Sequence, residues 1–370
     1  MLTILKKVVL VGVGLLVLIV AVIGLGASYM DWSDALDLSK TRTTDLPYLS
    51  QAQSPTRGKI LAIVSSTATM QVPTKNGIKE KKAGFELTEL ARAYMVFTVN
   101  GYTVDVASPL GGNAVYVRDD DDMGAYDYAF LNDAAAMGKV EHTKKISEIK
   151  VNDYAAIYLV GGKGTMFDFR NNSQLQNLVA EAWEQGAIVA AVCHGPAGLL
   201  GVRLRDGQAL LAHRSVTGFT NAEELFLIKR APEVFGSLLE DDLKKAGATF
   251  VAGPQYLEQL VIDGKLITGQ NPWSVWAMAE AVVKQLGQAP VAREITAEEL
   301  AVKVLLAYRR HGRDAAYEAL SALPAAERSR LDRNLIGMHI LVSLMQKQWR
   351  QSRDLFLLLR QAKIKASLVG

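Results

Sequence analysis

Short apolar runs alternate with helical patterns through the middle of the chain. Lys59–Val64, Tyr154–Val160 and Ala187–Val192 have the length and composition of buried strands. Across Leu87–Val99 the apolar residues recur at helical spacing, and Asn100-Gly101 ends that pattern. Strands that alternate with helices predict an α/β domain with a mainly parallel sheet covered on both faces. In such sheets ligands bind at the carboxyl ends of the strands.

The same patterns predict further elements within residues 58–288. They are a strand at Tyr102–Ala107, a helix from a capping box at Ser173 and Gln176 to Gln185, a helix with Asn221 as its N-cap, a hairpin at Leu260–Ile267 and a helix at Trp273–Leu286.

Residues 291–370 have a different pattern, with few glycines and no strand-like runs. Helical spacing at Ala297–Arg310, Asp314–Leu323 and, with interruptions, Ala325–Arg360 predicts an α-helical extension. The segment carries 14 Lys and Arg against 8 Asp and Glu. Solvated helix faces are the simplest explanation of that charge, and an anionic partner or a membrane surface is the alternative.

The N-terminus is apolar and uncharged from Val8 to Met30, a length that spans a hydrocarbon core of about 30 Å. Lys6 and Lys7 precede this run and acidic residues follow it. By the positive-inside rule, residues 1–30 are expected to form a single-pass transmembrane signal-anchor with a periplasmic or other extracytoplasmic body. A cleaved signal peptide is the alternative. Residues 31–57 are polar and are expected to form a linker.

Composition limits the classes of function. The 370 residues are 49% hydrophobic and 21% charged, which is typical of a globular protein. A net charge of only +3 gives no indication of nucleic-acid binding. The single cysteine excludes an internal disulfide framework and a cysteine-rich metal site.

That single cysteine lies where a predicted strand ends, in Ala-Ala-Val-Cys193-His194-Gly-Pro. A turn into a helix is expected here, so the thiol would point into open space near a helix N-terminus, which favours the thiolate. His194 directly follows, and it is a candidate partner for a cysteine nucleophile. A small buried cysteine is the structural alternative.

Three other segments carry candidate chemistry. Gly161-Gly162-Lys163-Gly164 follows a predicted strand and would let backbone N–H groups approach an oxyanion, although a plain turn has the same pattern. It lacks the spacing of a phosphate-binding loop. Glu89 falls near the apolar side of its helix, where desolvation disfavours the charged form of a carboxyl. Glu223 and Glu224 stand at a helix start, where acidic residues are common.

Together these segments resemble the ThiJ/PfpI superfamily, the cysteine relatives of class I glutamine amidotransferases. The resemblance covers residues 58–288. It rests on Gly84-Phe-Glu-Leu-Thr-Glu89-Leu, Tyr158-Leu-Val-Gly-Gly-Lys-Gly-Thr-Met-Phe-Asp168, Ala190-Ala-Val-Cys-His-Gly-Pro-Ala197 and Val216-Thr-Gly-Phe-Thr-Asn-Ala-Glu-Glu224. The most similar branch contains the chaperone-like, glutathione-independent glyoxalases, also called D-lactate dehydratases. A flavodoxin-like three-layer sandwich is the fold that the resemblance implies.

The resemblance also implies roles for individual residues. Cys193 is the expected nucleophile, His194 its partner, and Glu224 the acidic third member, with Glu223 as the fallback. Glu89 matches the carboxylic acid that contacts the sulfur. The expected oxyanion and substrate-binding residues are Gly161, Gly162 and Lys163, with the backbone amides of Gly162 and His194 as donors.

Two departures concern substrate choice. The family's usual Gly-Gly-His-Gly is Gly-Gly-Lys-Gly here, and its usual His-Pro after the first helix's Glu-Leu-Ala is Arg92-Ala93.

The implied activity is the conversion of 2-oxoaldehydes, such as methylglyoxal to lactate, or related carbonyl-stress detoxification, without a metal or other cofactor. Glycated molecules are possible substrates, and a homodimer is compatible with the family. The alternatives are a membrane-tethered stress chaperone that senses oxidation, and a peptidase or amidase of the same superfamily. An exposed thiol of low pKa is what an oxidation sensor needs.

Overall fold

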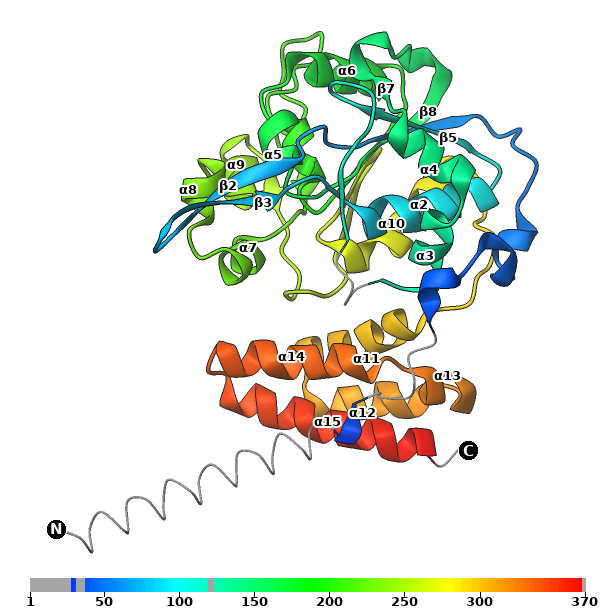
Figure 1. Cartoon of the computed structure of the whole chain (residues 1–370), viewed down its shortest axis with the longest axis vertical. Coiled ribbons are helices and arrows are strands. Elements are labelled where there is room, and N and C mark those ends of the chain that lie inside the picture. Colours follow the sequence, from blue (N-terminus) through cyan, green and yellow to red (C-terminus); the bar gives the residue numbers. More distant parts are fainter. Residues whose placement is uncertain (1–27, 31–36, 119–122, 368–370) are drawn as a thin grey trace, which may run out of the picture. The chain divides into compact units, whose positions relative to one another are not determined.

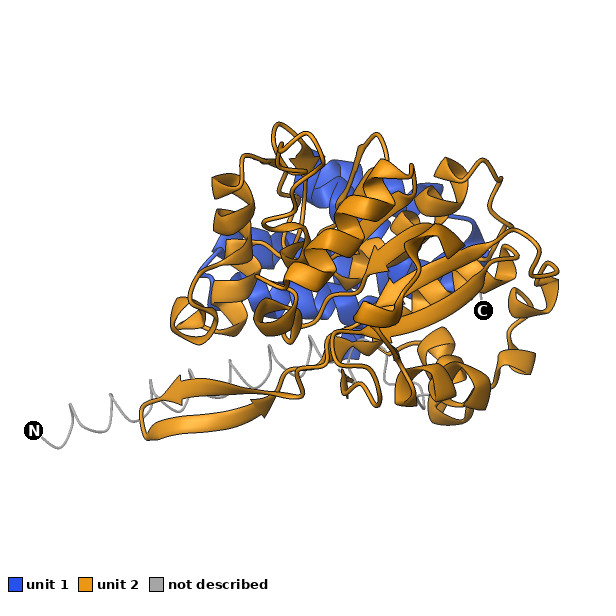
Figure 2. Ribbon diagram, turned by 90° about the horizontal axis from the view of Figure 1, so that it is seen from above, with its two compact units in different colours: residues 1–35, 295–370 blue, residues 36–294 orange. Residues whose placement is uncertain are grey.

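The computed structural model describes residues 28–30, 37–118 and 123–367. The chain divides into two compact units, one of residues 36–294 and one that joins residues 295–370 to the N-terminal residues 1–35 (Figure 2). The larger unit holds the predicted α/β domain, and the smaller one holds the C-terminal helices.

The larger unit is built on a seven-stranded sheet with the order β12-β13-β9-β8-β1-β5-β7 (Figure 1). Every pairing in it is parallel except that of β12 with β13, which is antiparallel. The mainly parallel sheet predicted from the strand–helix alternation is thereby confirmed. The strands are β1 (Lys59–Ile63), β5 (Thr103–Ser108), β7 (Lys144–Lys145), β8 (Tyr154–Leu159), β9 (Ile188–Val192), β12 (Leu260–Asp263) and β13 (Leu266–Gly269).

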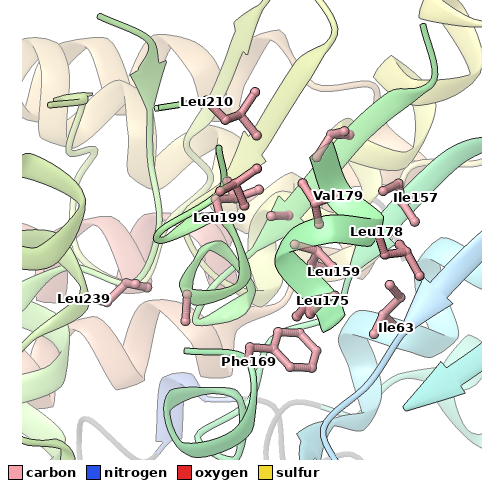
Figure 3. Packing of buried hydrophobic residues seen from close by; sticks show 14 of the residues in the cluster. Ile63, Ile157, Leu159, Phe169, Leu175, Leu178, Val179, Leu199, Leu210 and Leu239 are labelled. Atoms are coloured by element: carbon pink, nitrogen blue, oxygen red, sulfur yellow. The ribbon is translucent and has the colours of Figure 1, made fainter. Parts of the chain in front are cut away.

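Alternate side chains of the central strands pack on opposite faces of the sheet. Ile157 and Leu159 pack with Leu175 and Leu178 of α6 (Ser173–Glu184) in one apolar cluster (Figure 3). Tyr158 points to the other face, where its ring meets Phe97 of α2 (Leu87–Val99) edge to face at a centroid distance of 5.9 Å. The period of two along β8 therefore covers both faces with helices, as the three-layer prediction requires.

The remaining helices of this unit are mostly short. They are α3 (Ala125–Leu131), α4 (Ala134–Glu141), α5 (Thr165–Asp168), α7 (Asn221–Leu227), α8 (Ala231–Phe235), α9 (Leu239–Lys245) and α10 (Val275–Gln285). The unit also has the small strands β4 (Phe85–Glu86), β6 (Tyr116–Val117), β10 (Ser215–Val216) and β11 (Thr249–Phe250).

Two helix starts differ from the prediction by one residue. The N-cap of α6 is Asn172, whose side chain accepts from the N–H groups of Gln174 and Leu175, so the capping box expected at Ser173 does not form. The N-cap of α7 is Thr220 rather than Asn221, because the Thr220 hydroxyl accepts from the Glu223 N–H. Both caps follow the preference for short polar side chains at this position.

A β-ribbon of β2 (Thr69–Thr74) and β3 (Gly77–Lys82) was not predicted from the sequence. Met70 and Val72 are its buried residues, and all six residues of β3 are exposed. The ribbon is visible in Figure 1 as a pair of arrows running out beside α8. Its lysine-rich second strand hides the alternation that marks a half-buried strand.

Residues 37–57 lie against the larger unit. They form three short 3₁₀ turns, at Leu38–Lys40, Thr43–Asp45 and Leu49–Gln51. The Asn132 side chain donates to the carbonyls of Ser39 and Thr41, both at 2.8 Å.

The smaller unit consists of helices with no strand among its described residues. They are α11 (Ala297–His311), α12 (Arg313–Ala322), α13 (Ala325–Arg330), α14 (Arg333–Met345) and α15 (Trp349–Ser367). The helical extension expected from the sequence is present, with its long third segment divided at Leu331 and at the turn before Trp349.

The expected transmembrane helix requires a correction. In the part of the chain that the structure describes, no helix is both long and apolar enough to cross a membrane. Most of the expected span, residues 1–27, lies outside the described residues. The single-pass anchor in the predicted fold class and the periplasmic or extracytoplasmic location of the body both depended on that span, and the described structure does not bear them out.

Candidate active site

The backbone at Cys193 makes a sharp turn at the end of β9. Cys193 has a φ of 57°, a left-handed conformation that is uncommon for any residue other than glycine. Its N–H donates to the Gly269 carbonyl at 2.9 Å, and its carbonyl accepts from the Phe219 N–H at 2.8 Å. Strain held in this way by neighbouring strands is typical of a nucleophile placed between a strand and a helix.

His194 connects the thiol to a carboxylate. Its Nδ1 lies 3.3 Å from the Cys193 Sγ, and its Nε2 lies 2.5 Å from Oε2 of Glu224. The Phe219 ring packs against the imidazole at a centroid distance of 4.6 Å. A carboxylate that holds one ring nitrogen fixes which nitrogen faces the sulfur, so the three side chains have the arrangement of a nucleophile, a base and an orienting group.

The two adjacent glutamates of α7 have different surroundings. Glu223 accepts from the N–H of Tyr256 at 2.8 Å and from the Asn271 side chain at 2.9 Å, and it closes the capping box with Thr220. Glu224 instead faces His194. Burial raises the pKa of Glu223. Burial also acts to raise the pKa of Glu224, but the charges of His194 and Lys163 outweigh it and lower that pKa below its usual value.

Glu89 lies at the thiol. Its side chain is fully buried and hydrogen-bonds the Cys193 side chain, and its Oε2 accepts the Gly161 N–H at 2.8 Å. Any Cβ at Gly161 would stand 2.5 Å from Glu89 Oε2 and 2.7 Å from the Cys193 Cβ. Glycine at 161 is therefore what allows the thiol, the carboxyl and the turn to approach one another.

The predicted oxyanion residues are not equivalent. The Gly161 N–H is already used by Glu89. The N–H groups of Gly162 and His194 donate no hydrogen bond within the described parts of the chain. Gly162 has a φ of +103°, and a Cβ there would lie 2.6 Å from the backbone of Phe85, so this turn also needs glycine. Lys163 is half-buried beside it.

The thiol is more enclosed than the sequence suggested. Cys193 is 5% exposed, and the residues after it form a short 3₁₀ helix, Gly195–Leu199, in place of a full α-helix. Burial, the charge and hydrogen bond of Glu89, and the charge of Glu86 together raise the pKa of the Cys193 thiol, with only Lys163 acting to lower it. These surroundings favour the protonated thiol over the thiolate.

Three residues that the sequence analysis did not assign complete the surroundings. Phe219 holds the imidazole, the Thr165 hydroxyl donates to the His194 carbonyl at 3.0 Å, and Glu86 adds its charge near the sulfur. Phe219 and Thr165 lie inside the segments that carried the resemblance. Nothing in their residue type marks them as contacts of His194, because only the fold brings them there.

No group of three or more His, Cys, Asp or Glu side chains in the described residues is arranged to hold a metal ion. The chemistry available at this site is that of a thiol, an imidazole, two carboxyls and backbone amides.

A model described as the DJ-1/PfpI family matches residues 81–285, which is more than half of the chain. The chain belongs to the DJ-1/PfpI family. The resemblance drawn from the segments around Glu89, Gly161, Cys193 and Glu224 is thus confirmed at the level of the family.

Named relatives agree with this assignment. A glutathione-independent glyoxalase of Schizosaccharomyces pombe is 31% identical over 219 residues, covering 56% of this chain and 90% of that protein. A glutathione-independent glyoxalase of Saccharomyces cerevisiae is 32% identical over 209 residues, covering 54% of this chain and 87% of that protein.

Among solved structures, glyoxalase III of Candida albicans matches with a TM-score of 0.54 and 27% identity, covering 63% of this chain and 98% of that one. The 24-kDa Rapid Encystment Protein of Francisella tularensis matches with a TM-score of 0.56 and 28% identity, covering 62% of this chain and 99% of that one. These similarities confirm the α/β fold of the family.

Proposed function

We propose that this protein converts 2-oxoaldehydes to 2-hydroxy acids, methylglyoxal to lactate being the simplest case, with Cys193 as nucleophile and no added cofactor. The observation that carries this proposal is the continuous contact from Glu89 through Cys193 and His194 to Glu224. The relatives named as glutathione-independent glyoxalases support the choice of substrate class.

The reaction begins with attack of the sulfur on the aldehyde carbon of methylglyoxal. The thiol proton passes to His194 as the sulfur attacks, and the carbonyl oxygen of the aldehyde becomes an alkoxide. His194 then gives the proton to this oxygen, which completes a hemithioacetal. Because the His194 ring is held by Glu224, the positive charge it gains is stabilised where it forms.

The second stage moves a proton between the two carbons. Removal of the proton from the former aldehyde carbon gives an enediolate. Return of this proton to the neighbouring carbon, together with transfer of the hydroxyl proton from the former aldehyde oxygen to the neighbouring oxygen, gives a lactoyl thioester on Cys193. Glu89 is the proposed carrier of the proton that moves between the carbons, because its carboxyl lies at the sulfur and is enclosed by the protein. Water then cleaves the thioester, releases lactate and restores the thiol.

Negative charge on oxygen forms during attack and during hydrolysis. The N–H groups of Gly162 and His194 are the proposed donors, since they flank the thiol in the chain's fold and donate to no described residue. Lys163 is the proposed residue at the edge of this site, where its charge favours an anionic transition state.

An oxidation-sensing role is less well supported by the same geometry. A sensor needs an accessible thiolate, whereas Cys193 is 5% exposed and burial raises the pKa of its thiol. A peptidase or amidase would use the same nucleophile, so these activities differ in the carbonyl compound that the sulfur attacks.

The test uses the purified full chain, methylglyoxal and no glutathione, with lactate measured. The wild type is expected to form lactate, and Cys193→Ser and His194→Ala are expected to form almost none. His142→Ala, on an exposed histidine outside the site, is the matched control and should retain wild-type activity. Absence of lactate from the wild type would rule out this function, and equal turnover by Cys193→Ser would rule out the mechanism.

A further inference from the structure

A cavity of about 600 Å³ lies within the C-terminal helical unit, and every residue that lines it belongs to that unit. This volume falls within the range of about 300–1,000 Å³ that small-molecule sites occupy. Its walls are strongly polar and carry four arginines. They are Arg309, Arg313, Arg350 and Arg353.

The residues that line the cavity come from the end of α11 and from the starts of α12 and α15. Figure 1 shows these three helices in the C-terminal unit. Arg309 is in the last turn of α11, where a cation is favourable. Arg313 instead opens α12, and Arg350 and Arg353 stand in the first turns of α15. A cation at a helix N-terminus opposes the helix dipole, so three of the four arginines occupy positions that favour an anion.

The carboxylates of the cavity do not balance these charges. Asp354, whose side chain is 10% exposed, lies 3.2 Å from Arg353, 3.9 Å from Arg313 and 4.0 Å from Arg350. Asp314, the other acidic residue of the lining, has an 89% exposed side chain. The four guanidinium groups therefore face only two carboxylates among the residues that line the cavity, and one of these carboxylates is in solvent.

Arg309 is the least compensated of the four. It forms no ion pair with any described residue, and burial lowers the pKa of its guanidinium. Removing a cation from water without an opposing charge costs free energy unless a ligand supplies that charge.

We propose that this cavity binds a small molecule through a phosphate group. The guanidinium forks of arginine match the oxygens of phosphate in pairs, and a phosphate dianion would balance the two positive charges that the carboxylates leave. The N–H groups at the start of α12 offer further donors to the same anion. This site is separate from the residues proposed for catalysis.

The test is calorimetric titration of the full chain with inorganic pyrophosphate as the probe and with malonate, a dicarboxylate that carries less charge at neutral pH, as the comparison. Pyrophosphate is expected to bind more tightly than malonate. Arg309→Ala and Arg313→Ala should each weaken it by about tenfold or more, the loss of one charge-assisted pair. Arg360→Ala, on an exposed arginine of α15 outside the cavity, is the matched control and should bind normally.

Three results would overturn the proposal. They are no binding of pyrophosphate, malonate binding as tightly, and an equal loss of affinity in Arg360→Ala, which would indicate general attraction to a basic surface. If Arg309→Ala does not fold, Arg350→Ala provides the test, because that side chain is 91% exposed and its removal leaves the packing intact.

Discussion

Oε2 of Glu224 lies 2.5 Å from Nε2 of His194, while Glu223, the preceding residue, turns away into a separate set of hydrogen bonds. Glu224 thus holds the His194 ring, and Glu223 ties α7 to the loop at Tyr256 and Asn271. Because the contacts of Glu223 and Glu224 differ, substitutions of these two adjacent residues are expected to have opposite effects.

Glu224→Gln is expected to lower turnover of methylglyoxal by about 10²–10⁴-fold, the range found when a positioned proton-transfer group is impaired. Its melting temperature should change little. Glu223→Gln is expected to do the reverse, costing about 1–3 kcal/mol of unfolding free energy because one of its two acceptor oxygens becomes an NH2 group that faces buried donors. Lactate assays and denaturant titrations of both variants decide the matter, and an exchange of the two phenotypes would contradict the assignment.

Glu89→Gln tests the proposed proton carrier. Glutamine fills the same space and can still accept the Gly161 N–H, but it cannot hold and release a proton. We expect turnover to fall by about 10²-fold or more while the hemithioacetal still forms on Cys193. Rapid quenching and mass analysis would detect that adduct. Normal turnover in Glu89→Gln would remove Glu89 from the mechanism.

Gly161→Ala is expected to abolish activity through sterics alone. Its methyl group would collide with Glu89, Cys193 and the Val192 carbonyl, the closest approach being 2.5 Å. The matched control is Gly138→Ala in α4, where nothing lies within 4 Å of an added Cβ. Lactate formation and thermal unfolding of both variants provide the comparison, and an active Gly161→Ala protein would show that the site is looser than its geometry indicates.

The resting state of the thiol can be measured by its alkylation. Because burial and Glu89 raise the pKa of Cys193, the rate of iodoacetamide labelling should still be rising at pH 9. Labelling of Cys193→Ser provides the background. A rate that levels off below pH 7 would show that the cysteine is already a thiolate at rest.

Asp168 gives a pH dependence of folding stability. Burial raises its pKa from 3.8 to about 6, although Ser66, Ser65 and Thr67 donate to it. A carboxyl whose folded pKa is raised keeps its proton longer in the folded state, so its contribution to stability is lost as pH rises from about 4 to 6. A shift of two pKa units corresponds to about 3 kcal/mol as an upper bound. Asp168→Asn should flatten this part of the stability curve, and an unchanged slope in denaturant titrations would contradict it.

The sequence was most informative where an apolar pattern ended abruptly at polar residues or glycine. The patterns at Lys59–Val64 and Leu87–Val99 predicted β1 and α2 almost to the residue, because a short apolar run and a regular helical spacing of apolar residues are both simple to recognise. The β2–β3 ribbon was missed, since a strand with six exposed residues has no such pattern. Burial of the thiol was only the alternative expectation, because burial of Cys193 depends on Glu89 and Gly161, which come from other parts of the chain.

The transmembrane expectation was wrong because it rested on hydropathy alone. Hydropathy along Val8–Met30 records how apolar a stretch is, and it carries no information on packing. Within the described residues, Tyr29 lies edge to face with Phe356 of α15 at a centroid distance of 5.8 Å, and its carbonyl accepts from Arg333. The end of that apolar stretch therefore has partners inside the helical unit.

The central claim is that the sulfur of Cys193 carries the substrate as a thioester. The most direct measurement is mass analysis of peptides from the full chain, quenched with acid during turnover of methylglyoxal. The account predicts a single lactoyl group on the peptide that holds Cys193, with the group accumulating in His194→Ala if attack persists and hydrolysis slows. Lactate formed at the normal rate with Cys193 unmodified at every time point would contradict it.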